Sequence, residues 1–519
     1  MTTHPSRRAV IQGAAAISSI AALGTRWLTD PAFAAGKIPV LRYNRDLQTL
    51  DPPNRVGPLE EMIYNCCSQN LARFKPNVLD YELDACSKLD QVSETEIAFE
   101  LMPGQMFTGG YGELTAEDVK FSIERFRQPD KDGKLPAFAD DWLALDKVEV
   151  TGTYTGRILF KNPAPGIWMI GICDASGTLL SKKAYEALGD KVATTLIGSG
   201  PYVIKEWKPN EAIILARNPD YKGTLKTQFD EIHIRPIVDT KTAELAVKAG
   251  EVHFSDIDPA NIKDFEGDAN VEAKKLPAID YTWLALNMEK GPLADLKVRQ
   301  AIRLAVDVEA IMAGAYSGTA EPSRALLAPG LLGYWKDAPL YKRDVEKAKA
   351  LLAEAGQSGG FTTTITILNN TTDTATAQII QANLAEVGIT VNINTMDPGA
   401  YWAMGSDDKA KDIEMVIIQY LSKFDSTFQT QWFTSSQIGV WNWNRFGSPE
   451  FDELHAKAAA TNDKAAREAA FIRMQQLMDE SASFVWITHG VNAIANAKWL
   501  KPAYLPNVTN PQPQYFSEA

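Results

Sequence analysis

The sequence predicts an α/β fold, and three observations lead to that prediction. The chain has 519 residues, of which 45% are hydrophobic and 23% are charged, as in ordinary globular proteins. Helical and strand-like apolar periodicities alternate along it, most clearly between residues 361 and 420. The last apolar segment, residues 413–420, is nearly continuous in hydrophobic residues, which is typical of a strand buried in a parallel sheet. The length is enough for about three domains.

The first legible element is a helix that begins after Thr115. Thr115 is expected to be its N-cap, and Asp118 lies three residues later, where its carboxylate can accept from free backbone amides. Apolar residues between 298 and 312 recur at helical spacing and predict a second helix. A third is expected between 344 and 356, with Asp344 as its N-cap and Gly356 ending it.

The segment from 361 to 420 predicts a strand-helix-strand unit followed by a central strand. Residues 362–368 alternate between apolar and polar side chains, and residues 389–393 do the same. Between them, residues 373–387 place their apolar side chains on one helical face, and Gly388 ends that helix. Two parallel strands joined by a helix are the basic unit of an α/β lobe.

Charge and known motifs exclude several functional classes. The chain has 65 acidic and 52 basic residues, a net charge of −13, and no basic stripe, so a nucleic-acid partner is not expected. It carries none of the Gly-x-Ser-x-Gly, Walker, dinucleotide-binding or His-Glu-x-x-His motifs. Residues 130–133 begin like a calcium loop, but Lys134 and Leu135 replace an oxygen ligand and the turning glycine, so a plain turn is expected. We therefore predict a protein that is not an enzyme.

The N-terminus resembles a twin-arginine export signal. Arg7 and Arg8 precede a mildly apolar stretch, and Ala32-Phe33-Ala34 places small residues where a signal peptidase reads them. We predict a signal peptide over residues 1–34 and a periplasmic mature protein.

The four cysteines, Cys66, Cys67, Cys86 and Cys173, show no Cys-x-x-Cys spacing, so no metal or other cofactor is expected. A disulfide between Cys86 and either Cys66 or Cys67 is open, and Cys173 is expected to be a buried thiol.

Six segments, in the same order, resemble blocks of the family 5 extracytoplasmic solute-binding proteins, which serve importers of peptides and nickel driven by ATP (ABC importers). These segments are residues 101–107 with 114–125, 198–202, 217–221, 287–307, 344–356 and 446–452. The resemblance implies the two-lobed periplasmic-binding-protein fold (type II, three domains) in a monomer. It also implies a small-molecule or short-peptide ligand, which the protein delivers to an inner-membrane ABC permease and ATPase. The alternatives are an exported hydrolase that uses carboxylates, and a binding or sensor protein without an importer.

The resemblance also implies domain borders. A discontinuous domain I would comprise residues 37–60, 195–285 and 487–519. Domain II, over 61–194, would be inserted into it, and domain III, over 286–486, would form the second lobe.

Ligands of α/β sheets bind beyond the carboxyl ends of strands, so the loop after Tyr420 is expected to line the cleft. Either Lys423 or Asp425 in this loop would face the ligand: Asp425 suits a ligand ammonium, whereas Lys423 suits a carboxylate or a phosphate. Twelve tryptophans are present, and those after the central strand suit a pocket lining or the core. The loop after Tyr420 and the segments that the resemblance implies face the ligand give the expected ligand-binding residues, which are Asn54, Arg55, Trp283, Asn287, Tyr420, Lys423, Asp425, Trp441, Trp443 and Arg445.

Overall fold

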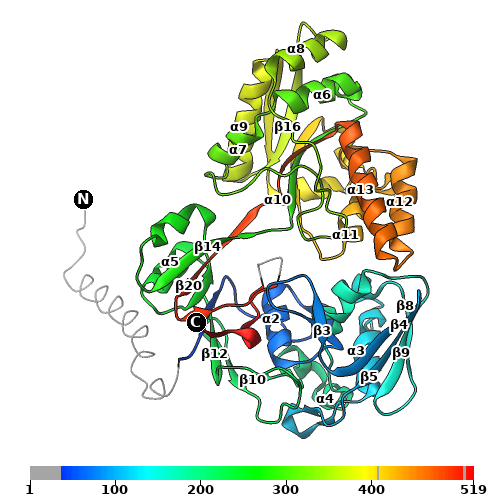
Figure 1. Ribbon diagram of the computed structural model, residues 1–519, viewed down its shortest axis with the longest axis vertical. Coiled ribbons are helices and arrows are strands. Elements are labelled where there is room, and N and C mark those ends of the chain that lie inside the picture. The colour runs from blue at the N-terminus through cyan, green and yellow to red at the C-terminus, as the bar shows by residue number, and fades with distance from the viewer. Residues whose placement is uncertain (1–36, 406–407, 506–509) are drawn as a thin grey trace, which may run out of the picture.

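The computed structural model describes residues 37–405, 408–505 and 510–519, which form two lobes joined by two crossings of the chain (Figure 1). The crossings are residues 278–280, between β14 (Val271–Pro277) and β15 (Tyr281–Leu286), and residues 489–490, between β19 (Phe484–Thr488) and β20 (Val491–Ala497). The predicted signal peptide, residues 1–34, lies outside the described residues.

A seven-stranded mixed sheet forms one part of the lower lobe. Its strand order is β10-β11-β12-β1-β13-β20-β14. Only β1 makes parallel pairs, with its neighbours β12 and β13. Apolar side chains of α2 pack in the same core as those of β1, β11 and β12. The remaining elements of this part are β1 (Val40–Tyr43), α2 (Pro58–Cys67), β10 (Tyr202–Lys208), β11 (Ala212–Arg217), β12 (Glu231–Pro236), α5 (Thr240–Lys248) and β13 (Phe254–Asp256).

The other part of the lower lobe is built on an antiparallel sheet of order β4-β5-β9-β8. The predicted helix after Thr115 is confirmed as α3 (Ala116–Glu124), where the Asp118 carboxylate accepts from the Thr115 backbone N–H at 3.0 Å. The remaining elements are β2 (Ala72–Phe74), β3 (Tyr81–Leu83), β4 (Cys86–Ser93), β5 (Glu96–Leu101), β6 (Met106–Phe107), β7 (Gly112–Glu113), β8 (Leu145–Val150), β9 (Thr155–Phe160) and α4 (Lys182–Leu188). The paired strands β21 (Leu500–Lys501) and β22 (Ser517–Glu518) belong with the seven-stranded sheet, because Leu500 and Phe516 lie in the same core as β1.

The upper lobe contains a five-stranded sheet of order β17-β16-β18-β15-β19, with the predicted central strand β18 (Met415–Tyr420) in its middle. The predicted strand-helix-strand unit is confirmed as β16 (Phe361–Leu368), α9 (Thr371–Ala385) and β17 (Ile389–Met396), with parallel strands. Asp344 caps α8 as predicted. The remaining helices are α6 (Leu296–Ala305), α7 (Val308–Gly314), α8 (Val345–Glu354), α10 (Pro398–Trp402), α11 (Ser426–Thr430), α12 (Pro449–Ala459) and α13 (Lys464–Ser481).

Two expectations need correction. The single helix predicted over 298–312 is two helices, because the Asp307 carboxylate accepts from the Ala310 backbone N–H and starts α7 anew. All of β15 pairs within the upper sheet, so residues 281–285 do not belong with domain I. The cysteine question that the sequence left open has an answer: all four cysteines are free and buried, which confirms the buried thiol of Cys173, and Cys66 and Cys86 lie in different hydrophobic clusters.

Candidate functional site

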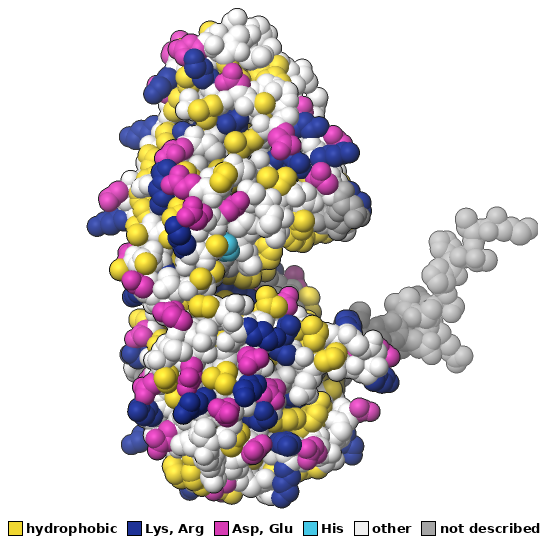
Figure 2. Space-filling view, turned by 90° about the vertical axis from the view of Figure 1, so that its right-hand side faces the viewer, with side chains coloured by type: hydrophobic (Ala, Val, Ile, Leu, Met, Phe, Trp, Pro, Cys, Tyr) yellow, Lys and Arg dark blue, Asp and Glu magenta, His cyan; other side chains and the backbone are white. Residues whose placement is uncertain are grey.

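A cleft separates the lobes and is seen as a notch in the surface, with hydrophobic side chains along its upper edge (Figure 2). On one side of the cleft the lobes touch through the loop 421–425, which follows β18. The Lys423 ammonium lies 2.5 Å from an Asp141 carboxylate oxygen of the lower lobe. The Phe424 ring meets Phe74 of the lower lobe edge-on, with centroids 5.0 Å apart. The loop after the central strand therefore faces the lower lobe, where sequence reasoning expects the ligand.

A second bridge lies next to α13. The Asn462 backbone N–H donates to the Glu94 carboxylate of the lower lobe at 2.9 Å. Gly166 of the lower lobe lies against Asp425, since a Cβ on this glycine would come within 3.1 Å of the Asp425 carboxyl carbon.

The lower lobe meets Lys423 with a cluster of charged side chains, of which Arg55 is buried and the carboxylates are half-buried. The Arg55 guanidinium donates to Glu61 at 3.0 Å and to Asp141 at 3.2 Å, and it stacks on Phe138. Asp174 joins this cluster: burial, followed by the negative charge of Glu61, raises the pKa of its carboxyl to about 7. The cluster therefore contains three carboxyl groups, those of Glu61, Asp141 and Asp174, and two cations, those of Arg55 and Lys423.

Asp425 is bound inside the upper lobe. Its two carboxylate oxygens accept from Nη2 of Arg467 on α13 at 2.9 and 2.8 Å, and one of them also accepts from the Thr427 backbone N–H at 3.0 Å. Asp425 and Arg467 are both buried. Of the two alternatives in this loop, the charge that reaches the lower lobe is Lys423.

An aromatic group lies where β17 and β18 end, at the carboxyl edge of the upper sheet. Trp441 stacks on Trp443, with centroids 6.3 Å apart, and the Tyr420 hydroxyl donates to the Trp441 carbonyl at 2.7 Å. Trp443 and Tyr420 are buried, whereas Trp441 is half-buried. Trp402, which sequence reasoning missed, lies 6.3 Å from Trp441 between ring centroids and is exposed. Trp402 and Trp441 are therefore the members of this group that can reach a ligand.

The other predicted residues bind within their own lobes. Trp283 is buried and donates to the Asn444 side chain at 3.1 Å. Asn287 is buried and donates to the Ile413 carbonyl at 2.7 Å. Arg445 pairs with Glu289 and Asp408, and Asn54 donates to Asp51 at 2.8 Å.

Sequence reasoning also missed Asp141 and Asp174. No motif marks them, because their proximity to Lys423 exists only in the folded chain. Glu61 lies in the first turn of α2, where an acidic residue is ordinary, so its place in the sequence does not distinguish it.

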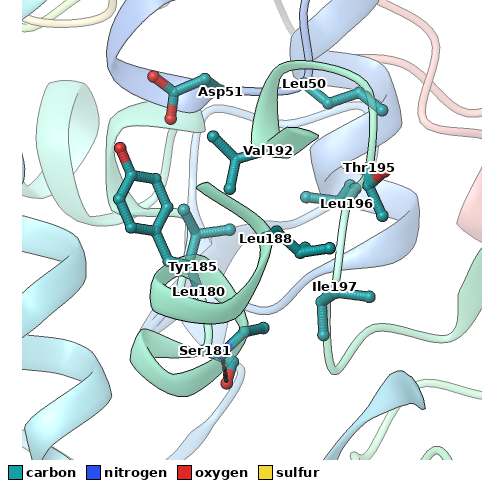
Figure 3. A pocket seen from close by; sticks show the side chains of 11 residues that line it. Leu50, Asp51, Leu180, Ser181, Tyr185, Leu188, Val192, Thr195, Leu196 and Ile197 are labelled. Atoms are coloured by element: carbon teal, nitrogen blue, oxygen red, sulfur yellow. Dashed lines mark hydrogen bonds between the residues drawn. The ribbon is translucent and has the colours of Figure 1, made fainter. Parts of the chain in front are cut away.

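An apolar pocket lies within the lower lobe, between α4 and the segments 50–51 and 192–197 (Figure 3). Leu188, Val192 and Leu196 line it, and its one carboxylate, that of Asp51, is held by Arg125 at 2.7 Å. No charge in its lining is therefore left for a ligand.

The model of the bacterial extracellular solute-binding proteins, family 5, matches residues 90–440. The chain belongs to this family. The glutathione-binding protein GsiB of Pectobacterium atrosepticum is 25% identical over 511 residues, which cover 94% of this chain and 97% of that protein. HbpA2 from Haemophilus parasuis superimposes with a TM-score of 0.85 at 23% identity, covering 93% of this chain and all of HbpA2.

The periplasmic binding protein DppA from Helicobacter pylori, solved with the peptide STSA, gives a TM-score of 0.72 at 25% identity and covers 93% of this chain and 98% of DppA. The two-lobed periplasmic-binding-protein fold of this family 5 protein is therefore established. Within the described residues, no helix is long and apolar enough to cross a membrane, and no group of His, Cys, Asp or Glu side chains is arranged to hold a metal ion.

Proposed function

We propose that this family 5 protein is the periplasmic binding component of an ABC importer and that its ligand is a short peptide of the size of glutathione. The ligand would bind in the cleft between the lobes, whose closure the importer would recognise. The twin arginines Arg7 and Arg8 support export of the folded protein to the periplasm.

The observation that carries this proposal is the cluster of charged side chains on either side of the cleft. A short peptide has an ammonium and one or more carboxylates, and a closed cleft must give each of them a partner. Glu61, Asp141 and Asp174 offer negative charge, whereas Arg55 and Lys423 offer positive charge. Arg55 and Lys423 each pair with a carboxylate of this cluster, so a zwitterionic ligand can exchange partners with them without stranding a charge.

The relatives support the same ligand class. GsiB binds glutathione, a tripeptide, and aligns with nearly the whole of this chain. DppA was solved with a bound peptide. The exposed Trp402 and the half-buried Trp441 supply flat apolar surface for a peptide's side chains.

The test is calorimetry on the mature chain, purified without denaturant, with glutathione and Gly-Gly-Gly, and with glucose and nickel–histidine as non-peptide controls. We expect at least one peptide to bind with a stoichiometry of one, and to stabilise the protein by about 2.7 kcal/mol at a hundredfold excess over Kd. Mass spectrometry of the solute that co-purifies would identify the natural ligand. Binding of a control solute together with no binding of either peptide would contradict the proposal.

A further inference from the structure

Asp280 lies in the first of the two crossings between the lobes, the segment 278–280 that leads from β14 to β15 (Figure 1). One oxygen of its carboxylate accepts from the Ser422 backbone N–H at 2.9 Å. Ser422 belongs to the loop 421–425, whose next two residues, Lys423 and Phe424, contact the lower lobe. Asp280 is therefore placed at the wall of the cleft, where the crossing meets the loop that joins the lobes.

The Asp280 carboxylate has no cationic partner. It forms no ion pair and no second hydrogen bond within the described part of the chain. Burial raises the pKa of its carboxyl, and the Ser422 backbone N–H is the one neighbour that opposes this rise. The side chain is half-buried, and its second oxygen remains in contact with solvent. A carboxylate partly removed from water without a counter-charge is destabilised, and a cationic group that reaches its open oxygen would relieve this.

The segments around Asp280 offer no cation of their own. The second crossing packs against the first, since a Cβ on Gly490 would lie 3.7 Å from the Ala278 side chain. In that crossing His489 donates to two backbone carbonyls, and burial lowers the pKa of its imidazole to about 4, so the ring is neutral at pH 7. In the loop, the Lys423 ammonium is bound to a carboxylate of the lower lobe. A cation for Asp280 must therefore come from outside these segments.

The other carboxylates at this side of the cleft are engaged already. Glu61, Asp141 and Asp425 each accept from an arginine or lysine side chain. Asp174 lies close enough to the two cations of the charge cluster for both to lower the pKa of its carboxyl. A ligand ammonium could bind to one of these four only in competition with a cation of the protein, whereas Asp280 can accept it directly.

We propose that Asp280 binds the ammonium group of the ligand, so that the solutes taken are those with a free primary amine. The inference rests on the proposed function, in which a short peptide is held between the lobes. The ammonium would form a charge-assisted hydrogen bond with a carboxylate that Ser422 already holds in place, so little further ordering is needed. Because the loop's own aspartate, Asp425, is bound to Arg467, the crossing supplies this charge in its place.

The experiment is calorimetry on the full mature chain with Gly-Gly-Gly and glutathione, each compared with its form acetylated on the α-amino group. Acetylation is expected to weaken binding to the wild type about 10- to 100-fold, the effect of losing a hydrogen bond between charged groups. In Asp280→Asn, the free peptides are expected to bind more weakly by the same factor and the acetylated peptides to bind as they do to the wild type. The ratio of the two affinities then falls below about threefold.

Asp344→Asn is the matched control. Asp344 also accepts from a backbone N–H at 2.9 Å, but it is exposed and lies at the start of α8, at the end of the upper lobe farthest from the cleft (Figure 1). This variant is expected to keep the wild-type ratio. Asparagine at position 280 can still accept from Ser422 and removes a charge without a partner, so Asp280→Asn is expected to unfold at the wild-type temperature or above it.

A ratio near one in the wild type, or an equally large ratio in Asp280→Asn, would overturn the inference while leaving peptide binding intact. A lower unfolding temperature of Asp280→Asn with an unchanged ratio would also overturn it, because Asp280 would then only brace the loop. If neither free peptide binds the wild type, the proposed function fails, and Asp280 is then tested with glycinamide, which has an ammonium and no carboxylate. Glycinamide is expected to raise the unfolding temperature of the wild type more than that of Asp280→Asn, and equal shifts would contradict the inference.

Discussion

Replacing Asp425 by alanine is expected to destabilise the upper lobe by about 3–5 kcal/mol and to leave ligand affinity unchanged. The variant leaves the Arg467 guanidinium buried without its counter-charge, and losing one member of a buried ion pair costs this much. For a lobe of this size, the loss corresponds to a fall in Tm of about 6–20 °C. The measurement is thermal and urea unfolding of the mature protein, followed by tryptophan fluorescence, to which the buried Trp283 and Trp443 of the upper lobe contribute.

Asp425 also caps α11, so the control must remove a cap alone. Asp344→Ala does so, because Asp344 caps α8, is exposed, and makes no ion pair within the described residues; its loss is expected to cost about 1 kcal/mol. The double variant Asp425→Ala/Arg467→Met removes both charges and is expected to regain part of the lost stability. An Asp425→Ala protein of normal stability that binds its ligand at least tenfold more weakly would refute the reasoning, since Asp425 would then face the ligand.

Three further predictions follow from single contacts. In Lys423→Met, loss of the contact with Asp141 is expected to enlarge the radius of gyration of the unliganded protein in X-ray scattering; an unchanged radius would show that this pair does not hold the lobes. The folded-state pKa of Asp174 is raised to about 7, so its contribution to the free energy of unfolding is greatest at low pH and declines as pH rises from about 4 to 7. In Asp174→Asn, the plot of this free energy against pH is expected to lose a slope that corresponds to at most one bound proton. An unaltered slope would contradict the raised pKa. Gly198→Ala is expected to lower the free energy of unfolding in urea by at least about 1–3 kcal/mol, because the new Cβ would meet the Cys67 carbonyl. In the control Gly359→Ala the new Cβ would meet nothing within 4 Å, so this variant is expected to be as stable as the wild type. Equal stabilities of the two variants would contradict the close approach at Gly198.

Local signals explain how far the fold could be predicted from the sequence. The helix after Thr115 and the central strand β18 were predictable because a cap or a run of apolar residues lies within the element itself. The same kind of signal was present at Asp307, where a capping residue divides the predicted helix, but the apolar spacing of the flanking residues continues across it and concealed the break. The predicted helix was too long because the apolar periodicity was given more weight than the capping residue Asp307.

The site could be predicted only in part, because charges find their partners through the tertiary fold. The position of β18 predicted that the following loop would face the other lobe, and Lys423 does so. Which of the loop's two charges would reach the lower lobe depended on Arg467, which lies on α13, 42 residues from Asp425 in sequence. Asp141 is 282 residues away from Lys423, and nothing in its own neighbourhood marks it. Sequence therefore located the loop but could not assign its charges.

The two charged residues of the loop 421–425 have partners in different lobes: Asp425 pairs within the upper lobe, and Lys423 pairs with the lower lobe. Asp425 ties the base of the loop to α13 through a buried ion pair, so the loop has a fixed origin in the upper lobe. Lys423 and Phe424 extend from that origin to Asp141 and Phe74 of the lower lobe. A rigid base is needed for this, because an ion pair gains little when both partners must first be ordered. Any ligand that enters between the lobes on this side must displace the contacts of Lys423 and Phe424 or rebuild them, and either change alters the relative position of the two lobes.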